Sequence, residues 1–360
     1  MFKNIDEFFR EYMERNWFTC GSIYISRNGR KLYHQSYGIL NNEKRDIKCR
    51  KNSLFDLASV TKIVTATVIL KLLSEGSLHL SAPLGYYIPE LSKNKALAPI
   101  TLKQLLTHSI GLIAWYPLYT YPQSEKDTLF TIFEEIKLKH QQRKKVVYSD
   151  LNNILLGEVL KHYFKSDLET IVRTQLAEPL HLDSLTYFPA DQDNVAATEY
   201  GNRIEKKMCH ELQLSFSKWR TEASPIEGEA NDGNAYYFFG GQSGHAGLFS
   251  NVIDVAKIGE LYVKGGLYNG KQFIHSRWIE NALSLHAENR GLGWEKSDIY
   301  PNGYGHTGFT GTAIWIEPER KLSVALFTNR LHVKQPVHLN EFRRKIFAAV
   351  IREVEHYGEG

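Results

Sequence analysis

The chain has 360 residues, of which 42% are hydrophobic and 23% are charged, and its formal net charge is +4 at pH 7. This composition is ordinary for a globular protein and leaves room for one large or two modest domains. The mild charge argues against nucleic acid as a partner, and no apolar run reaches the length of a membrane span. Three scattered cysteines are too few for a disulfide framework or a zinc site, so the sequence predicts no metal and no cofactor.

The first elements along the chain are a helix and a hairpin. Residues 1–18 form an amphipathic pattern that lacks the uninterrupted apolar core of a secretory signal. We therefore expect a cytoplasmic protein, and an exported form with a leader ahead of this sequence is the alternative. Residues 20–40 alternate around Asn28-Gly29, which predicts two antiparallel strands joined by a tight turn.

The next predicted element is a helix that starts at Ser59 and reads SVTKIVTATVILKLLSEG. Apolar residues cover almost every face of its 3.6-residue period, which indicates a helix buried on all sides. Gly76 and Pro83 mark its end. Ser59 therefore lies near the N-terminus of a buried helix.

Ser59 and Lys62 are three residues apart, so their side chains share one helix face. A serine hydroxyl becomes a good nucleophile when a base takes its proton, and burial and the helix dipole both lower a lysine pKa towards that role. Free N–H groups at the helix start can stabilise an oxyanion. The alternative is an N-cap serine followed by a surface lysine, but an unpaired charge is costly inside an apolar helix.

Two further segments carry polar groups at the edges of predicted elements. Tyr148 stands at a junction between a loop and the helical run NNILLGEVLKHYF, where a side chain can be held firmly and still face a cleft. The second segment, GHTGFTG at 305–311, precedes a predicted hairpin over 311–328. Its glycines allow close approach of a substrate, and the amide of Phe309 is a candidate second oxyanion donor.

The order of these elements indicates an α/β (α+β) fold with an antiparallel sheet flanked by helices. Both chain ends, 1–55 and 240–360, are expected to build this sheet domain, with a last helix from Asn340 to about Glu355. Residues 56–239 are expected to form an inserted, mostly helical domain. The active site is then predicted in the cleft between the two parts.

Ser-x-x-Lys at 59–62, a Tyr-x-Asn-like motif at 148–150 and His-Thr-Gly at 306–308 follow one another in an order that resembles the serine β-lactamase and penicillin-binding-protein superfamily. The class C β-lactamase and esterase-like (D-aminopeptidase-like) branch fits best, and the resemblance runs from about residue 15 to about residue 350. It implies a β-lactamase/transpeptidase-like fold.

The resemblance also implies a role for each matching residue. Ser59 would be the acylated nucleophile, Lys62 its hydrogen-bonded base partner and Tyr148 the proton shuttle. The backbone amides of Ser59 and Phe309 would form the oxyanion hole. The acyl-binding edge strand would be lined by Thr307 and Gly308.

Two positions depart from the family pattern. Asp150 stands where most class C β-lactamases have asparagine, and a pair with Lys62 would raise the lysine pKa and shift the base role towards Tyr148. Asn152 is the alternative source of the amide, although its place on the helix turns it away. His306 replaces the lysine of Lys-Thr-Gly with a group that is mostly neutral at pH 7, which weakens a clamp for a β-lactam carboxylate.

His245 is the remaining candidate for substrate binding, because it ends an aromatic-rich segment that is either a pocket wall or a packed loop. His108, within LLTHSIGL, is expected to be a hydrogen-bonded structural residue.

Taken together, the sequence predicts a serine hydrolase that forms an acyl-enzyme on a small-molecule or peptide substrate: an ester, an amide or a D-amino-acid peptide. The alternatives are β-lactamase or DD-peptidase activity, and a non-catalytic sensor of cell-wall fragments or penicillins. The oligomeric state stays open.

Overall fold

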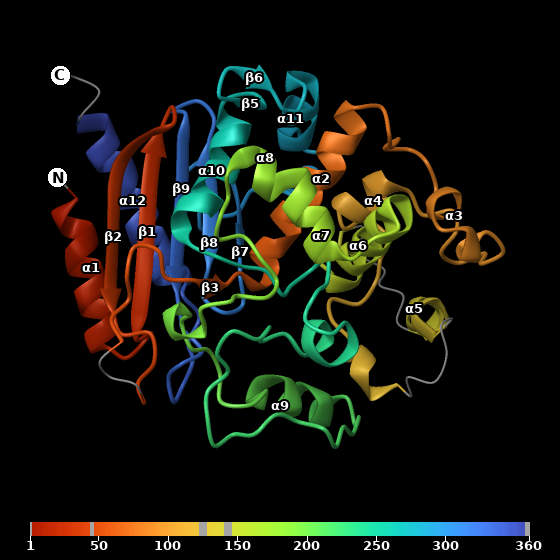
Figure 1. Cartoon of the computed structure of the whole chain (residues 1–360), viewed down its shortest axis with the longest axis horizontal. Helices are drawn as coiled ribbons and strands as arrows, with labels where there is room; N and C mark the ends of the chain where they lie inside the picture. Colours follow the sequence, from red (N-terminus) through yellow and green to blue (C-terminus); the bar gives the residue numbers. More distant parts are fainter. Residues whose placement is uncertain (1, 44–46, 122–127, 140–145, 357–360) are drawn as a thin grey trace.

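The centre of the molecule is a five-stranded antiparallel sheet with the strand order β2-β1-β9-β8-β7 (Figure 1). The computed structural model describes residues 2–43, 47–121, 128–139 and 146–356. The strands of this sheet are β1 (Cys20–Arg27), β2 (Arg30–Gly38), β7 (Tyr304–Thr307), β8 (Ala313–Glu317) and β9 (Leu322–Thr328).

Both predicted hairpins are present. The first turns at Asn28 and Gly29, which have φ of 52° and 75° and so supply the left-handed backbone that a tight two-residue turn needs. The second joins β8 to β9, and the first strand β1 pairs with the last strand β9 from Gly21↔Thr328 to Arg27↔Leu322. The two ends of the chain therefore meet in the middle of one sheet.

Helices cover both faces of the sheet (Figure 1). On one face, α1 (Lys3–Glu14) and α12 (Asn340–His356) contact each other and enclose a core rich in aromatic rings, including Phe9, Phe342 and Trp315. On the other face, α10 (Val252–Val263) packs against β1, β8 and β9. A second and larger core lies on this side and continues into the helical part of the molecule.

The helical part surrounds α2 (Thr61–Ser74), in which twelve of the fourteen residues are buried. This burial agrees with an apolar pattern on every face. The other helices between the sheet strands are α3 (Leu84–Tyr87), α4 (Leu102–Leu106), α5 (Thr128–Lys139), α6 (Asp150–Phe164), α7 (Leu168–Val172), α8 (Glu178–Leu180), α9 (Arg203–Glu211) and α11 (Ser276–Leu283). Short strand pairs join β3 (Phe55–Asp56) to β4 (Phe249–Ser250) and β5 (Leu267–Tyr268) to β6 (Lys271–Gln272). The division into two domains with boundaries near 55 and 240 stays a prediction.

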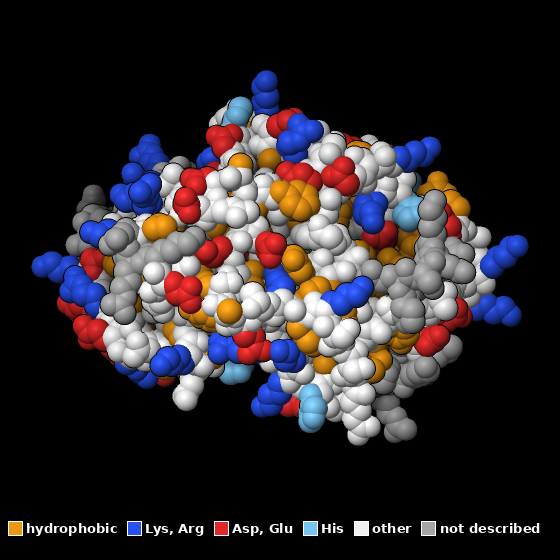
Figure 2. Space-filling model, turned by 60° about the horizontal axis from the view of Figure 1, so that its bottom comes forward, with side chains coloured by type: hydrophobic (Ala, Val, Ile, Leu, Met, Phe, Trp, Pro, Cys, Tyr) orange, Lys and Arg blue, Asp and Glu red, His pale blue; other side chains and the backbone are white. Residues whose placement is uncertain are grey.

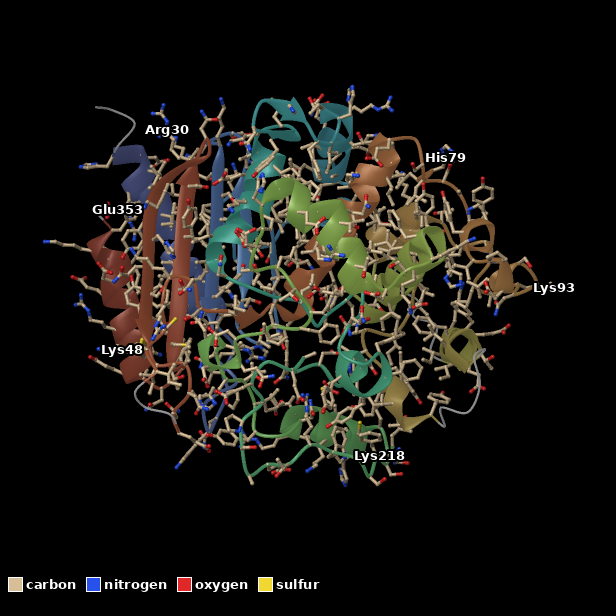
Figure 3. All side chains as sticks on the ribbon, in the orientation of Figure 1. Arg30, Lys48, His79, Lys93, Lys218 and Glu353 are labelled. Atoms are coloured by element: carbon tan, nitrogen blue, oxygen red, sulfur yellow. The ribbon has the colours of Figure 1, made fainter. Side chains whose placement is uncertain are left out.

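The labelled Lys48, Lys93 and Lys218 are exposed on the outside of the molecule (Figure 3). Acidic and basic groups are interspersed over the face shown in Figure 2. Within the described ranges, no helix is both long enough and apolar enough to cross a lipid bilayer.

Candidate active site

The candidate nucleophile lies in a short turn between β3 and α2. Ser59 is part of a 3-10 turn, η1 (Ala58–Val60), and the α-helix begins at Thr61 rather than at Ser59. Its side chain is half-buried and lines a cavity. The residue before it, Ala58, has a left-handed backbone with φ of 43°, a conformation that L-residues with a Cβ seldom adopt. The turn therefore holds Ser59 at the mouth of the helix in a strained local conformation.

Lys62 is buried and points back towards this serine. Its Nζ donates a hydrogen bond to Ser59 Oγ at 2.7 Å and another to the carbonyl of His245 at 3.1 Å, and it lies 2.7 Å from Asp150 Oδ1. Burial by itself lowers the pKa of this ammonium, but the Asp150 carboxylate and the Tyr148 hydroxyl outweigh burial, so the pKa of Lys62 is raised. In the resting state the lysine is thus a cation.

Tyr148 lies next to the ammonium group of Lys62. The turn before α6 is tied to the 108–114 segment through Val147 N–H to the carbonyl of His108 (3.0 Å) and Ser149 N–H to His108 Nδ1 (3.2 Å). The phenol ring has Lys62 Nζ 5.2 Å from its centroid. Burial raises the pKa of Tyr148, and the charge of Lys62 and hydrogen bonding to Lys62 and Ser59 offset this in part, leaving the pKa raised.

The loop after β7 faces the nucleophile turn. His306 and Thr307 are the last residues of β7, which lies at the edge of the sheet, as the family resemblance implies. Two side-chain hydrogen bonds join the loop to the turn, from Thr310 Oγ1 to the carbonyl of Asp56 (2.6 Å) and from Thr312 Oγ1 to the carbonyl of Leu57 (2.8 Å). The two segments that carry the candidate oxyanion donors are therefore fixed relative to each other.

Gly308 allows this close contact. A Cβ at this position would lie 2.1 Å from Thr312 Oγ1 and 2.6 Å from the carbonyl oxygen of Leu57. Arg330 Nε donates to the carbonyl of Phe309 at 2.6 Å, and Arg343 Nη2 donates to the carbonyl of Thr312 at 3.0 Å. The loop that carries the Phe309 amide is thus also held by two arginine side chains.

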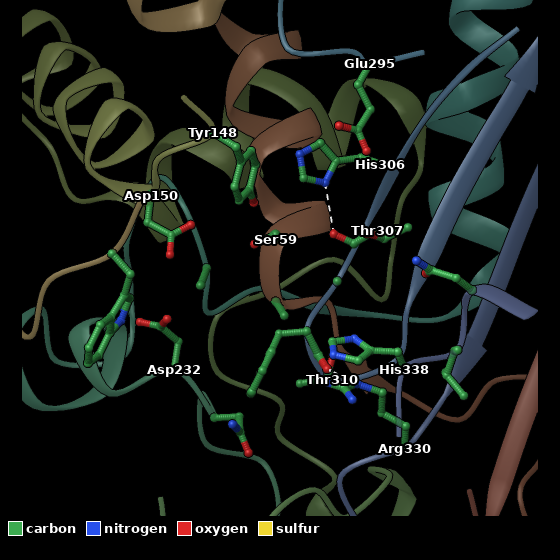
Figure 4. Close-up of a pocket in the computed structure, with 18 of the residues that line it drawn as sticks. Ser59, Tyr148, Asp150, Asp232, Glu295, His306, Thr307, Thr310, Arg330 and His338 are labelled. Atoms are coloured by element: carbon green, nitrogen blue, oxygen red, sulfur yellow. Dashed lines mark hydrogen bonds between the residues drawn. The ribbon is translucent and has the colours of Figure 1, made fainter. Parts of the chain in front are cut away.

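His306 is a neutral group in this site. Its Nδ1 contacts the carbonyl of Thr307 at 3.0 Å (Figure 4), and its side chain is buried. Burial, together with the charges of Lys62 and Arg290, holds the pKa of His306 well below its usual value. The position that carries a lysine in Lys-Thr-Gly thus carries no charge here.

The residues described above surround one cavity with a volume of about 540 Å³. Figure 4 shows Asp150 and Asp232 on one side of Ser59, and Thr307, Arg330 and His338 on the other. Of the predicted site residues, those that line the cavity are Ser59, Tyr148, Asp150, His306, Thr307, Gly308 and Phe309. Lys62 lies behind Ser59 and reaches it by its ammonium group.

Two predicted substrate-binding residues do not reach the cavity, and both expectations are corrected. Asn152 is fully buried, and its Nδ2 lies 2.8 Å from Nδ1 of His108, because two residues along α6 the side chain points away from Asp150. The imidazole of His245 is buried between Ser243 Oγ (2.7 Å) and Asp232 Oδ1 (2.9 Å). His245 contacts the site through its backbone carbonyl, which accepts from Lys62, and through its imidazole, which contacts Asp232.

Sequence reasoning missed several residues that shape the cavity. Asp232 lines it as a carboxylate, since the charge interaction with His245 and the hydrogen bond to it together outweigh burial and lower the Asp232 pKa. Arg290 forms an ion pair with Glu295 at 2.7 Å and places its guanidinium 5.1 Å from the Tyr148 ring centroid. No local motif marks these residues. Asp56 is different, because its place three residues before Ser59 in FDLAS could have indicated, from the sequence alone, a residue that supports the turn of the nucleophile.

One group of potential metal ligands adjoins the site. Ligand atoms of Asp150, Asp232 and His245 lie within 4.8 Å of one another. Asp150 is paired with the Lys62 ammonium and His245 with Asp232, so a metal cation here would meet an existing positive charge. The expectation that the reaction needs no metal stays a prediction.

A serine placed as a candidate nucleophile, a lysine and a tyrosine surround one cavity, and this arrangement is typical of a serine hydrolase that acts on amide, ester or peptide bonds. The chain belongs to the beta-lactamase family, whose model matches residues 5–348.

Curated relatives extend over most of the chain. A putative D-alanyl-D-alanine carboxypeptidase of Escherichia coli K12 is 28% identical over 86% of this chain and 78% of its own length. An N-acetylmuramyl-L-alanine amidase of Bacillus subtilis is 29% identical over 88% of this chain and 78% of its own.

Solved structures share the fold. A class C beta-lactamase from Rhodobacter sphaeroides superposes with a TM-score of 0.74 at 16% identity, covering 98% of this chain and 99% of its own. A penicillin-binding protein homologue from Pyrococcus abyssi gives 0.72 at 20% identity, covering 97% of this chain and 76% of its own. The predicted β-lactamase/transpeptidase-like fold is confirmed.

Proposed function

We propose that the protein hydrolyses an amide bond in a peptide-bearing fragment of the cell wall, through an acyl-enzyme on Ser59. The observation that carries this proposal is the contact of Lys62 Nζ with Ser59 Oγ at 2.7 Å in a cavity that also contains Tyr148. The carbonyl carbon of the substrate would lie in front of Ser59, with its oxygen towards the amides of Ser59 and Phe309.

Each step is defined by the atom that gives the proton and the atom that takes it. Ser59 Oγ attacks the carbonyl carbon and gives its proton to the deprotonated form of Tyr148. The resulting phenol then protonates the leaving amine as the C–N bond breaks. Water deacylates the ester by the same route in reverse, with its proton going to the phenolate and then to Ser59 Oγ. Lys62 stays an ammonium that stabilises the phenolate and positions Ser59.

Two features favour a peptide fragment over a β-lactam as the substrate. His306 is neutral, so the edge strand offers no lysine ammonium for the carboxylate of a β-lactam. The cavity of about 540 Å³ is within the usual range for a ligand of drug size, and carries carboxylates on one wall and guanidinium groups on another. Peptide fragments with both amino and carboxylate groups match this charge pattern. The relatives described as a carboxypeptidase and an amidase are consistent with such substrates.

The first experiment tests the nucleophile. A fluorophosphonate probe should add one label per chain, located on Ser59 by peptide mass mapping, and Ser59→Ala should abolish it. Ser109→Ala is a matched control, because the Ser109 hydroxyl is hydrogen-bonded to the Thr107 hydroxyl (Oγ to Oγ1, 2.9 Å) and Ser109 does not line the cavity. Labelling that persists in Ser59→Ala would reject the assignment.

The second experiment separates the substrate classes. A panel should compare N-acetylmuramyl-L-alanine peptides, D-alanyl-D-alanine peptides, p-nitrophenyl esters and nitrocefin. We expect the highest kcat/KM with one of the peptide fragments. Faster hydrolysis of nitrocefin would favour a β-lactamase, and saturable binding of a fragment without turnover would favour the non-catalytic sensor.

A further inference from the structure

Asp56 is a buried carboxylate whose two oxygens both accept backbone N–H groups of the active-site walls. Oδ1 accepts from Ala58 at 2.7 Å, and Oδ2 accepts from Asn231 at 2.7 Å. The residue is 2% exposed and does not line the cavity, so it cannot contact a substrate directly. Its effect on the reaction has to pass through the segments that it holds.

The first of these segments is the strained turn that carries the nucleophile. Ala58 has φ of 43°, and its N–H is the group that Asp56 Oδ1 accepts. Left-handed backbone in a residue with a Cβ persists where surrounding contacts over-determine it. Ser59 follows directly, so the direction of its N–H and of its Oγ depends on the conformation of Ala58.

The second segment forms the opposite wall and returns to the same serine. Asn231 is followed by Asp232, whose Oδ1 lies 2.9 Å from His245 Nε2. The carbonyl of His245 accepts a hydrogen bond from Lys62 Nζ at 3.1 Å, and Lys62 Nζ also donates a hydrogen bond to Ser59 Oγ at 2.7 Å. Asp56 thus closes a ring of contacts that fixes both the backbone of the nucleophile and its lysine partner.

The third segment carries the other candidate oxyanion donor. Thr310 Oγ1 donates to the backbone carbonyl of Asp56 at 2.6 Å, one residue after Phe309. Asp56 itself is fixed by the strand pair β3–β4, where it lies opposite Phe249. One residue therefore connects the turn of Ser59, the wall of Asp232 and the loop of Phe309.

We propose that Asp56 is a positioning residue of this hydrolase: its carboxylate holds the left-handed backbone at Ala58 and thereby sets Ser59 against Lys62 and the oxyanion hole. The inference rests on the proposed function of Ser59. Because Asp56 acts on the geometry of the attacking group and not on substrate contacts, its loss should lower kcat and leave KM nearly unchanged.

The test uses a second substitution that removes the strain. Asp56→Ala should lower kcat and the rate of fluorophosphonate labelling about a hundredfold, with KM within about threefold of wild type. Glycine adopts positive φ without a steric cost, so Ala58→Gly in the Asp56→Ala background should recover at least about tenfold of the lost rate. Ala58→Gly by itself is the reference for the double variant, and the loss caused by Asp56→Ala should be smaller in this background than in the wild type.

Asp254→Ala is the matched control for loss of a buried carboxylate. Asp254 is 4% exposed and accepts the Ser184 N–H at 2.8 Å, but it lies in α10 and does not line the cavity. This variant should lose stability and keep its kcat. If Asp56→Ala does not fold, Asp56→Asn, which keeps one acceptor oxygen, should show a smaller loss and the same rescue by glycine.

Three results would overturn the inference: no rescue by Ala58→Gly, a loss confined to KM, or an equal loss of kcat in Asp254→Ala. A failure of the proposed function is distinguishable from these. It would appear as labelling or turnover that persists in Ser59→Ala, whereas the role of Asp56 is read from the ratios of rates between its own variants.

Discussion

Replacing Asp150 with asparagine should lower the pKa of Lys62 and so increase the fraction of this side chain that is a neutral amine near and above neutral pH. Asp150 Oδ1 lies 2.7 Å from Lys62 Nζ, and this carboxylate is the main reason that the lysine pKa is raised despite burial. At an effective dielectric constant of about 20, the attraction at this distance is about 6 kcal/mol, or about 4 pKa units. Solvent and the amide dipole of asparagine replace part of it, so we expect the Lys62 pKa to fall once the carboxylate is gone.

The assay is the pH dependence of fluorophosphonate labelling, which reports acylation alone. In the wild type, Lys62 and Tyr148 both have raised pKa values, so the rate should increase with pH above neutrality. In Asp150→Asn the neutral fraction of Lys62 is larger at each pH and can accept the Ser59 proton, so the acid limb should move to lower pH by about 1 to 3 pH units. Asp254→Asn removes a carboxylate 2.9 Å from Lys257, remote from the cavity, and should leave the profile in place.

The same variant has a signature in stability. The pKa of Lys62 is raised above its ordinary value of 10.5, so the pair stabilises the native state below that pH and its contribution is lost as pH rises through the folded-state pKa. Breaking a buried pair costs about 3 to 5 kcal/mol when the remaining charge persists. Urea unfolding at several pH values should show the deficit of Asp150→Asn shrinking as pH increases. An acid limb that stays at the wild-type pH would refute the reasoning.

Three further predictions concern single residues of the site. Tyr148→Phe removes the proton shuttle and should lower kcat by about 10²- to 10⁴-fold with an unchanged near-UV spectrum; rates near wild type would exclude the shuttle. Gly308→Ala places a Cβ 2.1 Å from Thr312 Oγ1, so kcat should fall at least about tenfold and Tm should decrease, and an unaltered kcat would show that the loop adapts freely. His306→Lys introduces a cation beside Lys62 and Arg290; it should raise the affinity for carboxylate-bearing β-lactams, measured by competition with the fluorophosphonate, and no change would contradict the clamp argument.

Local signals in the sequence were enough to predict these elements and the contact between Ser59 and Lys62. The apolar pattern over 59–76 predicted a buried helix, and Asn28-Gly29 predicted a hairpin turn, because both depend on residues close together in the chain. The spacing of Ser59 and Lys62 predicted their contact, since positions i and i+3 share a helix face. The motif order added Tyr148 to the same cavity.

The orientation of individual polar side chains was decided only by the tertiary structure. Asn152 and His245 were offered as cavity residues, but they are buried against His108 and Asp232. The helix spacing already indicated that Asn152 turns away from Asp150, whereas nothing in the local sequence of His245 indicates where its imidazole lies. Whether Lys62 is a base or a cation depends on Asp150, which lies 88 residues away in the chain and 2.7 Å away in space. A pKa reflects all charges within a few ångströms, and the sequence alone does not contain those distances.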